Sequence, residues 1–137
     1  MKLNLAILGS TGSIGKSLLN IISKDKKKFK ISLLTANSNY QLILKQAKKF
    51  NVKNIIITDK QCFDLARSKN KIKNLNIFNN FQNLEKIFKN KIDYVMSSII
   101  GLDGLYPTLK IIKYTKKIAI ANKESLICGW NLILKEL

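Results

Sequence analysis

The sequence of 137 residues contains no histidine, one proline and two cysteines. The absence of histidine excludes histidine-based acid–base catalysis and removes the commonest metal ligand of proteins. Cys62 and Cys128 show neither C-x-x-C nor metal-ligand spacing, so a disulfide scaffold is excluded and a reducing, cytoplasmic location is expected. No apolar run approaches the roughly 18–20 residues that a transmembrane helix needs, and we expect no membrane partner.

Acidic residues are also few, because eight Asp and Glu stand against 25 Lys and Arg, for a formal net charge of +17. Such a charge is typical of nucleic-acid-binding proteins. However, Arg67 is the single arginine, and arginine is the side chain that grips phosphates and base edges with two parallel hydrogen bonds. The lysines are scattered among many asparagines and isoleucines, as AT-rich codon usage produces. We interpret the charge as a solvated surface and expect no specific nucleic-acid partner, with a basic nucleic-acid-binding module as the alternative.

Short apolar runs alternate with segments of helical periodicity along the whole chain. Strands are predicted at residues 3–8, 31–35, 55–57, 77–78, 94–96 and 118–120. Helices are predicted over 14–22 and 40–50, around 65–66, over 84–88, through 105–112 and from 123 onward. The third helix is preceded by Thr58-Asp59-Lys60-Gln61, which has the form of a capping box beginning at Thr58.

This alternation predicts an α/β fold, a doubly wound parallel sheet of the Rossmann-like kind with helices on both faces. The chain stops at Glu136-Leu137, inside a predicted helix. We therefore expect residues 1–137 to form one domain that is truncated at its C-terminus.

The segment between the first strand and the first helix carries the strongest motif, Gly9-Ser10-Thr11-Gly12-Ser13-Ile14-Gly15. In a dinucleotide site, the first glycine makes a tight turn, the second lets a pyrophosphate approach the backbone, and the third allows close packing of helix on strand. Free N–H groups at the helix start would hold the anion, and Thr11 and Ser13 would add hydroxyl donors. The G-x-x-G-x-x-G spacing predicts a dinucleotide more firmly than it predicts a reaction.

The second strand ends in a turn without acid, Asn37-Ser38-Asn39. NAD sites usually place Asp or Glu here against the ribose 2′-hydroxyl, and a carboxylate would repel a 2′-phosphate. The absence of an acid therefore favours NADP, although an ordinary polar turn fits these residues equally well.

Polar residues also follow the last strand, in Ala121-Asn122-Lys123-Glu124-Ser125. The carboxyl ends of strands line the ligand crevice of a doubly wound sheet, so this segment is a candidate for the nicotinamide and substrate region. Asn122 also fits the role of helix cap, and both roles are compatible. The segment 97–101, after the preceding strand, occupies the equivalent rim and is a further candidate for contact with the cofactor.

Three segments together resemble the 1-deoxy-D-xylulose 5-phosphate reductoisomerases: 7–15 (ILGSTGSIG), 100–109 (IGLDGLYPTL) and 121–126 (ANKESL). The resemblance covers nearly the whole chain, in order and at appropriate spacing. It implies conversion of 1-deoxy-D-xylulose 5-phosphate, a sugar phosphate, to 2-C-methyl-D-erythritol 4-phosphate in the non-mevalonate isoprenoid pathway. It also implies NADPH as the reductant, Mg²⁺ or Mn²⁺ as the metal, and a homodimer for the full-length enzyme.

The resemblance also assigns residues to the site. It implies that the cofactor phosphates are bound by Thr11, Gly12, Ser13 and Ile14, the adenosine ribose and 2′-phosphate by Asn37, Ser38 and Asn39, the nicotinamide half by Asn122 and Glu124, and the substrate by Lys123. One departure is that the family often has Gly followed by Lys or Arg where this chain has Asn37-Ser38. A second is that the family's metal-binding carboxylates, substrate-phosphate site and flexible loop lie C-terminal to this segment. The resemblance thus implies an incomplete NADPH-binding domain, with no catalytic or metal-binding residue and no turnover of its own.

Two other interpretations stay open at this point. Another Rossmann-fold NAD(P)-dependent dehydrogenase, such as a semialdehyde or homoserine dehydrogenase, would account for the glycine loop but not for the A-N-K-E-S segment. A decayed or prematurely stopped gene product would leave Leu132, Ile133 and Leu137 without a packing partner and would tend to aggregate.

Overall fold

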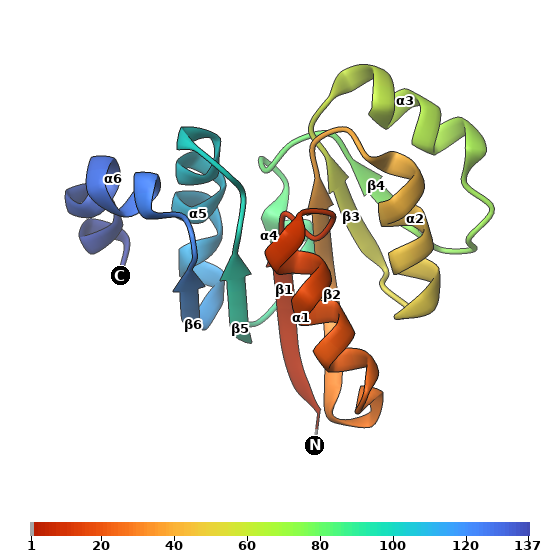
Figure 1. Cartoon of the computed structure of the whole chain (residues 1–137), viewed down its shortest axis with the longest axis horizontal. Coiled ribbons are helices and arrows are strands. Elements are labelled where there is room, and N and C mark those ends of the chain that lie inside the picture. The colour runs from red at the N-terminus through yellow and green to blue at the C-terminus, as the bar shows by residue number, and fades with distance from the viewer. Residues whose placement is uncertain (1) are drawn as a thin grey trace.

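The computed structural model describes residues 2–137, so Met1, the first residue of the predicted domain, lies outside the described residues. The described chain forms a six-stranded sheet in the order β4-β3-β2-β1-β5-β6, and every neighbouring pair is parallel. The strands are β1 (Leu3–Leu8), β2 (Phe29–Ala36), β3 (Asn54–Ile57), β4 (Asn76–Phe78), β5 (Ile92–Ser97) and β6 (Thr115–Ile120). The predicted doubly wound parallel sheet is confirmed (Figure 1).

Helices connect the strands. They are α1 (Ser13–Ser23), α2 (Tyr40–Lys49), α3 (Lys60–Lys69), α4 (Leu84–Ile87), α5 (Leu105–Ile111) and α6 (Lys123–Glu136), with 3-10 turns η1 (Lys26–Lys28), η2 (Leu102–Gly104) and η3 (Ile112–Tyr114). Pro107 lies in the first turn of α5, where a missing N–H costs no helix hydrogen bond. None of the helices within residues 2–137 is long and apolar enough to cross a membrane.

The core consists of two apolar clusters, one on each face of the sheet. Alternate residues of β1 enter different clusters, with Ile7 facing α1, α2 and α3, and Leu8 facing α4 and α5. Both side chains are fully buried, as expected for the central strand of a sheet covered on two faces. Because all neighbouring strands are parallel, their ends at Leu8, Ala36, Ile57, Ser97 and Ile120 lie on the same side of the sheet. We call this side the carboxyl edge and the opposite side the amino edge.

Most boundaries differ from the sequence prediction by a few residues, as at β2 (predicted over 31–35), β5 (94–96) and β6 (118–120). The start of α3 differs for a specific reason. Asp59, not Thr58, caps α3, because its carboxylate accepts a hydrogen bond from the Cys62 N–H at 3.0 Å. The Thr58 hydroxyl is engaged elsewhere and donates to Asn37 Oδ1 at 2.8 Å. A tertiary contact therefore takes the hydroxyl that the capping-box pattern assigned to the helix.

Helix α6 lies at the side of the molecule opposite α3 and packs on α5 (Figure 1). Its glycine, Gly129, is close to Leu105, and a Cβ there would lie 2.9 Å from Leu105 Cδ2. The prediction that Ile133 lacks a packing partner is wrong, since this side chain is 1% exposed. Leu132 and Leu137 are exposed as expected.

Candidate functional site

The carboxyl edge contains a cavity of about 870 Å³ at the point where the chain changes direction across the sheet. From β1 the chain proceeds outward through β2, β3 and β4, and then returns to place β5 on the other side of β1. Ligands of doubly wound sheets bind at such a switch point. The lining comes from the ends of five strands, the connections after them and the first turn of α5: Gly9, Thr11, Gly12, Thr35, Ala36, Asn37, Thr58, Asn79, Asn80, Phe81, Ser98, Ile99, Ile100, Leu102, Asp103, Tyr106 and Pro107.

Two glycines of the loop 9–15 are required by the fold itself. Gly9 has a φ of 81°, and a Cβ there would lie 3.0 Å from the Ser98 carbonyl oxygen. A Cβ at Gly15 would lie 2.6 Å from Ser10 Cα and 2.8 Å from Ser10 C, which is closer than real Cβ contacts come. These two positions bring β1, β5 and α1 together at the loop.

Gly12 is different, because the protein leaves room for a side chain there. Its φ is −81°, and the nearest atom to an added Cβ is the Gly9 carbonyl oxygen at 3.6 Å. Nothing within the described chain therefore requires glycine at this position, while Gly12 lines the cavity. A bare backbone facing a cavity permits the close approach of a ligand, which is the function predicted for the second glycine.

Within the described residues, helix α1 begins at this loop without a side chain that caps its N-terminus. Gly12 is its N-cap residue, no side chain within residues 2–137 caps it, and its first turn holds no acid. Asn39, Asp59 and Asn122, in contrast, cap α2, α3 and α6 with their side chains. The N–H groups of the first turn of α1 are thus left to a ligand, and the helix dipole makes an anion the favoured one.

The predicted phosphate-binding residues lie on both sides of this helix start. Thr11 and Gly12 line the cavity, whereas Ser13 and Ile14 form the first turn of α1 and are exposed. The backbone N–H groups of the first turn have no acceptor within the helix and are available as donors, whereas the Ile14 side chain has no donor to offer.

The turn after β2 lies beside the glycine loop. Asn37 lines the cavity, and its backbone oxygen accepts from the Asp59 N–H at 2.9 Å. The side chain of Asn39 caps α2 by accepting from the Leu42 N–H at 3.2 Å. Ser38 is exposed, and its hydroxyl makes no hydrogen bond within the part of the chain that the structure describes. Of the three predicted residues, Ser38 is the one whose side chain is not occupied within the protein.

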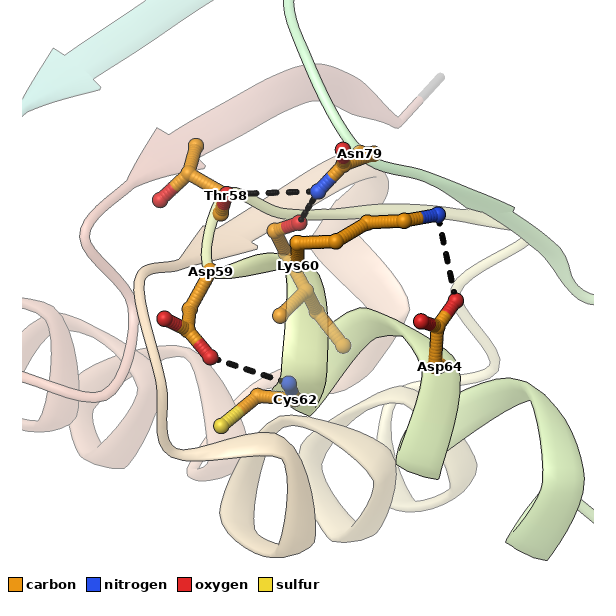
Figure 2. Close-up of polar contacts among 7 residues, drawn as sticks. Thr58, Asp59, Lys60, Cys62, Asp64 and Asn79 are labelled. Atoms are coloured by element: carbon orange, nitrogen blue, oxygen red, sulfur yellow. Dashed lines mark hydrogen bonds and ion pairs between the residues drawn. The ribbon is translucent and has the colours of Figure 1, made fainter.

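The loops after β3 and β4 supply a wall that the sequence analysis missed. Asn79 donates from its side-chain amide to the backbone oxygens of Ile57 at 2.9 Å and Thr58 at 3.2 Å (Figure 2). Figure 2 also shows the Asp59 carboxylate at the start of α3, where the hydrogen bond from the Cys62 N–H holds the pKa of this carboxyl below its ordinary value. The position of Thr58 directly after a strand was the available signal, since Asn37 follows β2 in the same way.

The residues predicted for the nicotinamide and substrate lie just outside the cavity lining. Asn122 is 6% exposed, and its amide donates to the backbone oxygens of Ile99 and Gly101 while its oxygen accepts from the Ser125 N–H at 3.1 Å. Lys123 and Glu124 are exposed in the first turn of α6. Asn122 thus connects the end of β6 to the rim of the cavity, since Ile99 is part of the lining.

The segment after β5 lies on the rim as predicted, because Ser98, Ile99 and Ile100 line the cavity. Ser98 is bonded to β1, where its hydroxyl donates to the Leu8 carbonyl oxygen at 2.7 Å. No group of three or more His, Cys, Asp or Glu side chains within residues 2–137 is arranged to hold a metal ion.

Residues 5–129 match the family model of 1-deoxy-D-xylulose 5-phosphate reductoisomerase. The chain is 61% identical over 135 residues to the 1-deoxy-D-xylulose 5-phosphate reductoisomerase of Pelagibacter ubique, and this match covers 97% of the chain and 35% of the relative. It is 41% identical over 133 residues to that of Thermodesulfovibrio yellowstonii, covering 96% of the chain and 34% of the relative.

Solved structures of 1-deoxy-D-xylulose 5-phosphate reductoisomerases also superpose on this chain. The reductoisomerase of Zymomonas mobilis in complex with NADPH superposes with a TM-score of 0.88 at 30% identity, covering 99% of this chain and 36% of that one. A reductoisomerase in complex with NADPH, fosmidomycin and magnesium superposes with a TM-score of 0.86 at 32% identity, covering 98% of this chain and 33% of that one. The chain therefore spans about a third of the length of the relatives that it matches.

Proposed function

The chain belongs to the 1-deoxy-D-xylulose 5-phosphate reductoisomerase family, and from this premise we propose that it supplies the NADPH-binding part of such an enzyme. The reaction is the NADPH-dependent rearrangement and reduction of 1-deoxy-D-xylulose 5-phosphate to 2-C-methyl-D-erythritol 4-phosphate in isoprenoid biosynthesis. Family membership sets aside the alternatives of another dehydrogenase and of a nucleic-acid-binding module, since neither accounts for a match over residues 5–129.

The observation that carries the proposal is the open backbone of Gly12 at the uncapped start of α1. The cavity beside it has the donors that a dinucleotide pyrophosphate needs, in the first-turn N–H groups of α1 and the Thr11 hydroxyl. Its other walls include apolar side chains such as Ile100 and Phe81, which suit the rings of the cofactor. The residues present therefore fit NADPH.

Each group of predicted residues has a role in this proposal. The backbone at Thr11, Gly12, Ser13 and Ile14 binds the pyrophosphate, and Asn37, Ser38 and Asn39 surround the adenosine ribose and its 2′-phosphate. Because the Asn39 side chain caps α2, we assign the 2′-phosphate contact chiefly to Ser38 and to nearby N–H groups.

Asn122, Glu124 and Lys123 lie next to the nicotinamide half and the substrate in this proposal. Since the Asn122 amide is bonded to Ile99 and Gly101, we assign to it the task of holding the rim against which the nicotinamide lies. Lys123 and Glu124 are both exposed. We assign Glu124 to contact with the nicotinamide half and Lys123 to the sugar-phosphate substrate. When bound, NADPH supplies the hydride for the reduction.

The rest of the active site comes from elsewhere in this proposal. We place the ligands of Mg²⁺ or Mn²⁺ and the substrate-phosphate site outside this chain. A homodimer for the full-length enzyme and a cytoplasmic location complete the proposal. The isolated chain should bind NADPH without turning over substrate, and NADPH-dependent product from the pure chain would contradict this.

The test is a titration of the purified chain with NADPH, followed by the fluorescence of the reduced nicotinamide. We expect saturable binding that Gly12→Ala weakens at least about tenfold, which corresponds to about 1.4 kcal/mol. The same variant should keep its free energy of unfolding within about 1 kcal/mol, because the φ of −81° suits alanine and its Cβ would meet no atom of the described chain closer than 3.6 Å. Ser17→Ala, at an exposed position further along α1, is the matched control and should change neither value. Absence of NADPH binding by the folded chain would refute the proposal.

A further inference from the structure

Gln46 of α2 is a buried polar side chain, 7% exposed, whose hydrogen bonds both go to the glycine loop. Its Nε2 donates to the Ser10 carbonyl oxygen at 3.0 Å, and its Oε1 accepts from the Ser10 hydroxyl at 2.8 Å. A carbonyl oxygen can only accept, so only one orientation of the amide satisfies the pair. Ser10, itself fully buried, is the one residue of the loop that is held at both its backbone and its side chain.

Thr35, at the end of β2, also holds the loop by hydrogen bonds. We call Gln46 and Thr35, with their hydrogen bonds to Gly9 and Ser10, the clamp on the glycine loop. Its hydroxyl accepts from the Gly9 N–H at 2.9 Å, and its backbone oxygen accepts from the Ser10 N–H at 2.9 Å. The loop is thereby fixed at Gly9 and Ser10, immediately before Thr11 and Gly12, which line the cavity. A loop held in its binding conformation loses less entropy when a ligand orders it, and so binds more tightly.

The same helix also carries the turn predicted to meet the 2′-phosphate. Asn39, the N-cap of α2, lies seven positions before Gln46, or about 10 Å along the helix axis. One rigid element therefore contacts the pyrophosphate loop near one end and forms the ribose-phosphate turn at the other.

We infer that Gln46 is a positioning residue, which holds the glycine loop in its phosphate-binding conformation and sets its distance from the 2′-phosphate turn. This inference rests on the proposed NADPH site. Gln46 is not among the residues that line the cavity, so its effect passes through Ser10 and not through contact with the cofactor.

The test compares Gln46→Leu with the unchanged chain, using NADPH and adenosine 2′-monophosphate as probes. The second probe keeps the adenosine and its 2′-phosphate but lacks the pyrophosphate. We expect Gln46→Leu to weaken NADPH binding about tenfold and to change the affinity for adenosine 2′-monophosphate less than twofold, both measured by NMR titration. Ser10→Ala removes the hydroxyl that donates to Gln46 Oε1 and to the Thr35 carbonyl oxygen, but keeps the bond from Gln46 Nε2 to the Ser10 carbonyl oxygen. It should weaken NADPH binding about threefold and gives a second variant if Gln46→Leu does not fold.

Thr115→Val is the matched control, since it removes a buried hydroxyl bonded to the Lys117 carbonyl oxygen at 2.8 Å, at the amino edge of the sheet. It should lower the unfolding midpoint while leaving both affinities within twofold. Equal losses for the two probes in Gln46→Leu, or unchanged NADPH affinity in Gln46→Leu or Ser10→Ala, would overturn the inference. Failure of the unchanged chain to bind NADPH would instead refute the proposed function.

Discussion

The two edges of the sheet both contain a cavity, but the cavities are built from different residues. At the carboxyl edge, the cavity of about 870 Å³ is lined by two glycines, three asparagines and no lysine. At the amino edge, a cavity of about 520 Å³ is lined by no glycine and by five lysines: Lys2, Lys26, Lys30, Lys49 and Lys53. The protein of net charge +17 thus keeps its lysines out of the cavity to which we assign an anionic cofactor.

The difference shows that anion recognition and positive charge are separate properties of this chain. N–H groups at a helix start lie at fixed positions and act at hydrogen-bond distance, whereas exposed lysines are mobile and are screened over about 8 Å at physiological salt. The lysines can therefore speed the approach of an anion without deciding where it binds.

The largest expected effect concerns the packing of the glycine loop. Gly15→Ala should lower the free energy of unfolding by about 3 kcal/mol or more, because its Cβ would overlap the backbone of Ser10. Gly101→Ala is the comparison, since Gly101 has a φ of 78° but nothing within 4 Å of an added Cβ. Strain alone should cost this variant about 1–2 kcal/mol. Urea unfolding followed by circular dichroism measures the free energy of unfolding of both variants. Equal losses would mean that overlap of the added Cβ with the Ser10 backbone is not the reason that glycine is required at position 15.

The second prediction changes the charge at the carboxyl edge itself. Ser38→Asp should weaken NADPH binding about tenfold by repulsion of the 2′-phosphate, and Ser38→Arg should strengthen it about fivefold through a charge-assisted hydrogen bond. NADH, which lacks this phosphate, should change less than twofold in the arginine variant. Equal responses of the two cofactors in calorimetric titrations would remove the 2′-phosphate from this turn.

The third prediction changes the charge at the amino edge. Replacing Lys26, Lys30, Lys49 and Lys53 together by Gln should leave the dissociation constant of NADPH within about twofold at 0.15 M salt. At low salt, stopped-flow measurements should show a slower association rate, since the long-range attraction is reduced. A tenfold loss of affinity at 0.15 M salt would break the distinction between the two edges.

The smallest effect is expected from two carboxylates, one at each edge. The pKa of Asp59 is lowered by the Cys62 N–H, and that of Asp93 is lowered by the Asn4 N–H and by Lys116. Because the folded pKa lies below the unfolded value of about 3.9, each group contributes stability at higher pH that is lost as the pH falls through the lowered pKa. In Asp59→Asn and in Asp93→Asn, the unfolding midpoint should fall less steeply as the pH is lowered into the acidic range. A fall as steep as that of the unchanged chain would contradict the contribution of that carboxylate to stability.

The sequence predicted the elements well because each strand contains an apolar run and each longer helix has a periodic face. Local signals also predicted the Asn122 cap, which is confirmed by the hydrogen bond from the Ser125 N–H. The capping box at Thr58 failed for a tertiary reason, since the Thr58 hydroxyl bonds to a residue 21 positions earlier. A local pattern does not contain that partner.

The lining of the cavity was predictable where a residue lies in the loop just after a strand, as Thr11, Gly12 and Asn37 do. Asn79 follows β4 directly and carried the same signal, although nothing local indicated its hydrogen bonds to the end of β3. Gln46 was not predictable, because its role depends on a contact across 36 positions of sequence. Its position three residues after Ile43 places Gln46 on the buried face of α2, but the helical pattern does not identify Ser10 as its partner.

The clamp on the glycine loop has a consequence for the order in which the protein is made. Gly9, Ser10, Thr35 and Gln46 all lie within the first 46 residues, whereas the contact that closes the other side of Gly9 comes from Ser98. A ribosome adds about 5–20 residues per second, so roughly 3–10 s pass between these points. All hydrogen bonds of the clamp are therefore available to a nascent chain before β5 has been synthesised.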